Sequence, residues 1–162
     1  MGMQNYLTEL LDWYRGEIAG EAFFSALAQR AEEPGQAAKW QTLARLEHLV
    51  ADRLRPELKA RGVEIPAAAA DVRRGQESAL EYLDLPWQQT LGRLRPYLDD
   101  YVREFQEAES RMPQDLQPLA QFVTAHERLL LEFVIREIDD GGRHSLDGAR
   151  QLLGEAASDT PD

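Results

Sequence analysis

Six side chains that can bind a metal ion or carry a proton occupy positions where amphipathic helices should be apolar. They are five glutamates and one histidine, namely Glu17, Glu21, Glu47, Glu104, His126 and Glu127. A helix turns by about 100° per residue, so Glu17 and Glu21 project within the arc of the leucines of their own segment. Burying an unpaired carboxylate is costly. Such a set therefore requires protons, cationic partners or a metal ion.

The composition limits the partners and the kinds of metal site. The chain has 162 residues, no cysteine, a formal net charge of -11, 43% hydrophobic residues and 29% charged residues. These values are typical of one globular domain. Without cysteine, disulfides, thiolate zinc sites and iron–sulfur clusters are excluded, so a metal would need carboxylate and imidazole ligands.

The charge and the start of the chain favour a soluble cytoplasmic protein. The negative charge repels nucleic acid and anionic membrane surfaces, and the arginines are scattered among acids. The first residues lack the basic start and apolar block of a signal peptide, and no apolar stretch approaches about 18 residues. We therefore expect no nucleic-acid and no membrane partner.

Apolar residues at helical spacing predict four long helices. We expect them over residues 5–32, 36–61, 87–111 and 115–138. The breaks between them are rich in proline and glycine, as in Glu33-Pro34-Gly35. Pro56 is expected to kink or shorten the second helix, and Pro96 to bend the third or delay its start.

The connections predict how these helices are arranged. The first and third are short and favour antiparallel hairpins, whereas the middle one, residues 62–86, can carry the chain back across the molecule. A short helix is expected within it at 71–83. The sequence thus predicts an all-α four-helix bundle over residues 1–142 with a long crossover between helices two and three. Residues 143–162 would add a short helix capped by Ser145 and a loose tail.

The two hairpins also resemble each other, and their acids can be aligned. The matched pairs are Glu17 with Asp100, Glu21 with Glu104, and Glu47 with Glu127. A tandem duplication and a chance similarity of amphipathic helices both fit this alignment. Counted from the hairpin loops, every helix offers a carboxylate near its middle, and His126 offers a nitrogen. This arrangement suits one or two divalent ions.

The motif Gly16-Glu17-x-x-Gly20-Glu21-x-x-Phe24, with the crossover and the inward acids, resembles the ferritin-like superfamily, particularly its rubrerythrin-like branch. The resemblance covers about residues 5–140 and implies two iron or manganese ions and oxygen, peroxide or electron-transfer chemistry. In this comparison Glu17 matches the acid of helix one, and Asp100 or Glu104 the acid of helix three. Glu47 and Glu127 match the glutamates of two Glu-x-x-His pairs.

The chain departs from that pattern at both histidines. Val50 and Leu130 stand three residues after the two glutamates, where the resemblance would place imidazoles. His48 and His126 are adjacent to these glutamates, but neighbours on a helix point about 100° apart. We expect His48 at the surface. For His126 a metal ligand and a hydrogen-bonded core residue are both open.

Three functions are compatible with these patterns. The first is a ferritin-like iron or manganese protein, with an oxidoreductase or metal-handling activity. The second is a non-enzymatic helical scaffold or interaction protein that has lost the metal site, with its acids satisfied by arginines such as Arg45 and Arg103 or by tyrosine and histidine. The third is a small-molecule pocket with Tyr14, Tyr97 and Tyr101 as polar handles. A homodimer through an apolar helix face is also expected, while any other protein partner is unknown.

Overall fold

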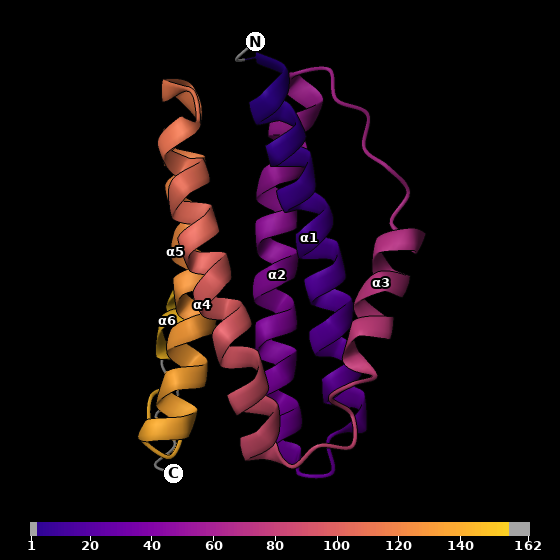
Figure 1. The fold of residues 1–162 in the computed structure, drawn as a ribbon, viewed down its shortest axis with the longest axis vertical. Helices are drawn as coiled ribbons and strands as arrows, with labels where there is room; N and C mark the ends of the chain where they lie inside the picture. Colours follow the sequence, from indigo (N-terminus) through magenta and orange to yellow (C-terminus); the bar gives the residue numbers. More distant parts are fainter. Residues whose placement is uncertain (1–2, 156–162) are drawn as a thin grey trace.

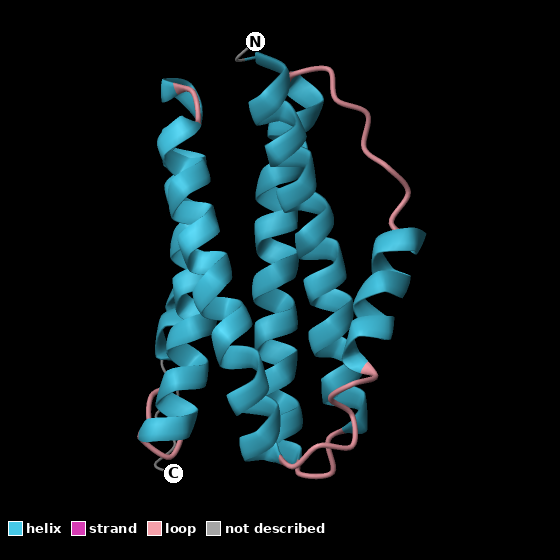
Figure 2. Ribbon diagram, in the orientation of Figure 1, coloured by secondary structure: helices cyan, strands magenta, loops and turns pink. Residues whose placement is uncertain are grey.

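The computed structural model describes residues 3–155, and this part of the chain is helical with no strand (Figures 1 and 2). The prediction of an all-α chain is confirmed. Side chains are described from Tyr6 onward, and most of the expected tail, residues 156–162, lies outside the described residues. The elements are α1 (Met3–Arg30), α2 (Pro34–Ala60), α3 (Ala69–Ala79), α4 (Trp87–Arg111), the 3-10 helix η1 (Gln114–Leu116), α5 (Gln117–Asp139) and α6 (Asp147–Leu152).

The four long helices form two hairpins. Helix α1 packs against α2, α4 packs against α5, and α2 faces α5 between the hairpins. After α2 the chain returns along the outside of α1, where α3 packs, before α4 begins (Figure 1). As a result, α2 and α4 run in the same direction (Figure 1).

The helix ends follow the proline and glycine positions. Pro34 occupies the first turn of α2, where its missing N–H costs nothing. Gly62, just after this helix, has a φ of +74°, which glycine adopts without strain. The helix continues through Pro56 to Ala60, so of the two effects expected of Pro56, a kink or a shorter helix, the shortening does not occur. Pro96 likewise lies inside α4 and does not delay its start.

Ser145 is not a helix cap, contrary to the sequence prediction. Helix α6 begins at Asp147, and no side chain caps it. The Ser145 hydroxyl instead donates to Glu137 Oε1 at 2.7 Å, and the same carboxylate binds the Lys39 ammonium. Glu137 is buried, and a buried carboxylate gains more from this donor than a helix end exposed to water would. The serine is therefore used to satisfy an acid.

The apolar core consists of two clusters at different levels of the long helices. The cluster nearer the α1–α2 turn is centred on Trp40, whose ring centroid lies 5.8 Å from that of Phe24 and 5.9 Å from that of Phe133. The other cluster, nearer the opposite end, includes Leu10 and Leu54. Each cluster receives residues from α1, α2, α4 and α5. The polar side chains described below lie between these two levels.

Helix α3 is held on α1 by a close backbone approach and an ion pair. A Cβ atom at Gly75 would lie 2.1 Å from the carbonyl oxygen of Ala19, so only glycine allows this distance. Asp71 is buried and accepts from Arg15 Nε at 3.2 Å, and Arg74 lies 3.4 Å from the same carboxylate. These contacts hold α3 against the side of α1.

Candidate metal centre

Three helices bring two acids and one imidazole together between the two apolar clusters. His126 Nε2, on α5, lies 3.1 Å from Glu47 Oε2 on α2 and 3.3 Å from Glu17 Oε2 on α1. The three side chains are almost completely buried. One ligand atom from each lies within 4.8 Å of the others. This group can therefore hold a metal ion.

The imidazole is oriented by its own helix. His126 Nδ1 lies 3.2 Å from the carbonyl oxygen of Val123, which can only accept a hydrogen bond. We therefore assign a proton to Nδ1, which leaves Nε2 directed at the two acids. Metal-binding histidines commonly donate their second ring nitrogen to a carbonyl or a carboxylate in this way.

Glu127 adds a fourth buried carboxyl group beside the cluster. Its Oε1 lies 3.9 Å from His126 Nδ1. Its Oε2, and Oε2 of Glu17, are buried and make no hydrogen bond with the part of the chain that the structure describes. Buried polar atoms nearly always have a partner, and leaving one without is costly. These two oxygens indicate that the site is built to receive a proton or a cation.

Burial and mutual charge shift the pKa values of the cluster. Burial, followed by the charges of Glu47 and Glu127, raises the pKa of Glu17 well above its ordinary value. Burial acts to raise the pKa of Glu47 as well, but the charge of His126 and hydrogen bonds to Glu17 and His126 lower it overall. Without metal, these shifts therefore favour a proton on Glu17 and a charge on Glu47.

The pKa values of His126 and Glu127 are both raised. Burial alone would lower the pKa of His126, but the charges of Glu47 and Glu127 outweigh it and raise the pKa to about 9. Burial raises the pKa of Glu127 to about 7, although the charge of His126 opposes that shift. In the metal-free protein His126 is thus a cation that donates from Nε2 to Glu47.

Gly20 makes room for the Glu47 carboxylate. A Cβ atom at Gly20 would lie 3.0 Å from Cδ of Glu47 and 3.1 Å and 3.2 Å from its two oxygens. At Gly16, one turn earlier on α1, a Cβ atom would meet nothing within 4 Å. The two glycines of the sequence motif therefore differ, and only Gly20 shapes the site.

The structure brings four of the six residues predicted from sequence together and separates two. The four are Glu17, Glu47, His126 and Glu127. Glu21 is partly exposed, and its Oε2 lies 3.2 Å from Nδ1 of the exposed His48. Glu104 is exposed on α4, as is Asp100, so the acid expected from the third long helix does not join the cluster.

The arginines expected to neutralise the acids are engaged elsewhere. Arg45 pairs with Glu155, and Arg103 pairs with Asp100 at 2.7 Å on the surface of α4. Among the described residues, no lysine or arginine forms an ion pair with the cluster of Glu17 and Glu47. Charge neutralisation thus depends on His126, on protons or on a bound cation.

The two positions without the expected histidines belong to the core. Val50 and Leu130 are buried in the two apolar clusters. The described group of ligand atoms, Glu17 with Glu47 and His126, accounts for one ion.

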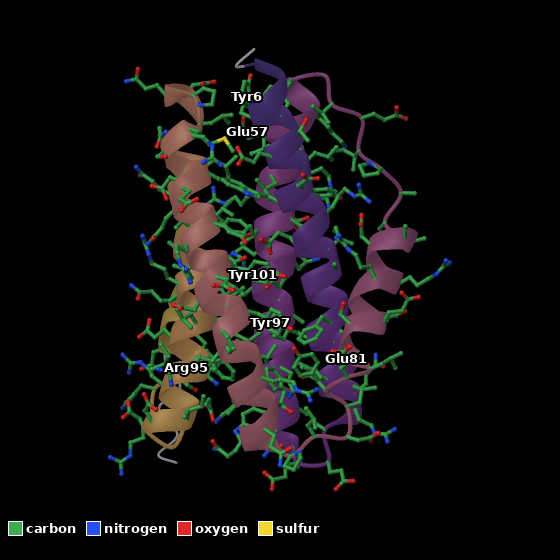
Figure 3. The ribbon with its side chains drawn as sticks, in the orientation of Figure 1. Tyr6, Glu57, Glu81, Arg95, Tyr97 and Tyr101 are labelled. Atoms are coloured by element: carbon green, nitrogen blue, oxygen red, sulfur yellow. The ribbon has the colours of Figure 1, made fainter. Side chains whose placement is uncertain are left out.

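A groove connects the cluster with the surface. It has a volume of about 870 Å³ and runs between α1, α3 and α4, with Glu17, Glu47 and Glu127 among its lining residues. Tyr97 and Tyr101 lie at its mouth, on the side of α4 that faces α1 (Figure 3). The stack of Trp13 on Phe105, with ring centroids 5.0 Å apart, joins α1 to α4 beside it. The buried acids therefore border a space that is open to the surface.

No family model, no curated protein and no solved structure matches this chain. Function must therefore be inferred from the geometry of the site. Sequence reasoning missed the carbonyl of Val123 as the partner of His126, because a backbone contact leaves no trace in residue type. It also missed the role of Gly20, although a glycine inside a helix costs about 1 kcal/mol relative to alanine and so suggests close packing.

Proposed function

We propose that the protein binds one divalent iron or manganese ion through Glu17, Glu47 and His126, in a ferritin-like four-helix bundle. The observation that carries this proposal is the convergence of the three ligand atoms on a buried point. Ligands about 2.1 Å from one ion lie about 3 Å apart when they are at right angles. The distances of 3.1 Å and 3.3 Å from His126 Nε2 to the two carboxylates agree with that spacing.

The charge of the cluster supports a divalent ion. Without metal, the directions of the pKa shifts favour a neutral Glu17, an ionised Glu47 and a cationic His126, and the charges of these three groups in that state sum to zero. Loading the site requires a proton to leave Glu17 and another to leave His126 Nε2. Two carboxylates, a neutral imidazole and a divalent ion also sum to zero. The exchange therefore leaves the summed charge of these three groups unchanged.

Two carboxylates and one imidazole, without thiolate, suit iron and manganese. Bound iron or manganese would supply one-electron chemistry toward oxygen or peroxide, which makes an oxidoreductase the favoured activity. The chain itself supplies apolar side chains above and below the acids, because an apolar cluster lies on each side of them along the helices. Glu127, at the inner end of the groove, can hold and release a proton near neutral pH, since its pKa is about 7.

Metal analysis of protein purified without oxygen tests the proposal. Protein supplied with Fe(II) or Mn(II) and then desalted should retain about one ion per chain, and Glu47→Ala should retain none. Glu21→Ala and Glu104→Ala are matched controls, because both remove a glutamate outside the cluster. The proposal is wrong if the parent retains no metal, or if Glu47→Ala retains as much as the parent.

A second function is supported by the hydrogen bond from His126 to Glu47, which exists without metal. A buried polar layer can fix how helices pack in a scaffold that binds no ion. In that case Glu47→Gln would destabilise the protein in a chelator, and Mn(II) would leave the melting temperature of the parent unchanged. A rise in melting temperature with Mn(II) would exclude the scaffold and support the metal site.

A further inference from the structure

The groove between α1, α3 and α4 is negatively charged along its rim. Four acids line it without an ion pair in the described part of the chain, namely Asp12, Glu81, Glu104 and Glu107. Its two arginines are already engaged. Arg111 pairs with Glu9 at 2.7 Å, and Arg74 pairs with Asp71 and donates to the carbonyl of Arg15. The groove therefore favours a cation and repels an anion.

Aromatic rings form opposite walls of the groove. Tyr97 and Tyr101 come from α4 and are 57% and 47% exposed, which makes them the most exposed aromatic side chains among the described residues (Figure 3). Phe23 of α1 and Tyr82, after α3, lie on the other side with their ring centroids 5.3 Å apart. Aromatic faces bind apolar groups and attract organic cations.

The inner end of the groove is lined by a carboxylate oxygen of Glu127 that accepts no hydrogen bond from the described residues. Glu127 is 7% exposed and lines the groove, and its Oε2 makes no hydrogen bond in the described structure. This oxygen is an independent sign of a missing donor, because a buried carboxylate oxygen is otherwise satisfied. An ammonium group would supply both the donor and the opposite charge.

We propose that this groove binds a small organic ammonium ion with an aromatic or alkyl body. The ammonium donates to Glu127, and the body packs between Tyr97 and Tyr101 on one side and Phe23 and Tyr82 on the other. The volume of about 870 Å³ falls within the range of about 300–1,000 Å³ usual for small-molecule sites. This inference does not depend on the metal, because Glu127 is not one of the three proposed ligands.

Three probes with the same phenylethyl body and different charge test the inference. We would titrate 2-phenylethylammonium, the neutral 2-phenylethanol and the anionic 3-phenylpropionate into the full chain, following amide shifts by NMR. Each titration contains a chelator, so a failure here is independent of the metal proposal. The ammonium should bind at least about tenfold more tightly than the alcohol, equivalent to about 1.4 kcal/mol, and shift residues of α1, α3 and α4. The carboxylate should not bind.

Two variants and a control locate the interaction. Glu127→Gln should abolish the tenfold preference for the ammonium, whereas Glu132→Gln, an exposed change on the same helix, should preserve it. Tyr101 is exposed, so Tyr101→Ala should leave the fold intact and weaken the binding of the ammonium several-fold. Equal affinity of the parent for ammonium and alcohol would overturn the inference. So would unchanged ammonium binding in Tyr101→Ala, which decides the case even if Glu127→Gln does not fold.

Discussion

Gly20 and Glu47 approach each other so closely that a methyl group at position 20 would press on the carboxylate, at 3.0 Å from Cδ. We expect Gly20→Ala to displace Glu47 and to weaken Mn(II) binding by about tenfold, which is typical for a residue that positions a ligand. Competition with a fluorescent chelator measures this change.

Gly16→Ala is the matched control, because a Cβ atom at Gly16 meets nothing within 4 Å. Both variants replace a glycine of α1 by alanine and gain helix propensity. Only the first should lose metal affinity. Equal affinity of the two variants would show that Gly20 does not shape the site.

The buried titrating groups make the stability of the metal-free protein depend on pH. The pKa of His126 is raised from 6.5 to about 9, so its stabilising contribution is complete below pH 6.5 and is lost as the pH rises through 9. The pKa of Glu127 is raised from 4.5 to about 7, so its ionisation destabilises the fold increasingly between pH 4.5 and 7. Both groups therefore lower the stability of the folded protein as the pH rises.

We therefore expect the melting temperature in a chelator to fall between pH 5 and pH 9, as measured by circular dichroism. Glu127→Gln should flatten the lower half of this curve and raise the melting temperature at pH 8. A melting temperature that rises over the same interval would contradict the assignment of these protons.

At the scale of the elements, Gly75 controls whether α3 can lie on α1. An added Cβ atom would meet the Ala19 carbonyl at 2.1 Å, and backbone cannot yield as a side chain does. We expect Gly75→Ala to cost about 1–3 kcal/mol of unfolding free energy, as overpacking usually does. Urea unfolding of the full chain measures it.

Gly92→Ala is the control for Gly75→Ala. Gly92 is exposed on α4, and a Cβ atom there meets nothing within 4 Å. This change should stabilise the protein by about 0.5–1 kcal/mol through helix propensity. If both glycine variants gain stability, the contact between α1 and α3 is looser than described.

The helices were readable from sequence because apolar spacing and proline–glycine breaks are local signals. The prediction for α4, residues 87–111, has the bounds that the structure shows. The inward positions of Glu17 and Glu47 also followed from spacing. Glu104 could not be placed in this way, since it lies at the edge of its apolar stripe. There the rotation of α4, and the groove beside it, decide what is exposed.

Interactions between residues on different elements could not be predicted from the sequence. Ser145 has the side chain of a good cap, but it lies in the turn before α6 and donates to Glu137, eight residues earlier on α5. His126 Nε2 does not pair with the sequence neighbour Glu127, whose Oε1 lies 3.9 Å from the other ring nitrogen, Nδ1. Nε2 faces acids on α1 and α2 instead, and helix periodicity placed His126 near their level without showing which acids the ring would contact.

At the scale of the whole molecule, the proposed metal site lies between two apolar clusters and connects three helices. A ligand that binds only the folded state adds about 2.7 kcal/mol at a hundred times its dissociation constant. For a chain of this size we expect Mn(II) to raise the melting temperature by roughly 5–10 °C. Scanning calorimetry should show this rise for the parent and none for Glu47→Ala.

The path of the chain between α2 and α4 has a practical consequence. A cut within residues 63–68 would leave α1 and α2 in one fragment, and α3, α4 and α5 in the other. Because α3 packs on α1 and α5 faces α2, the second fragment would contact the first on two sides. We expect the two fragments, produced separately, to reassemble when mixed. The protein would then be a natural candidate for a split reporter.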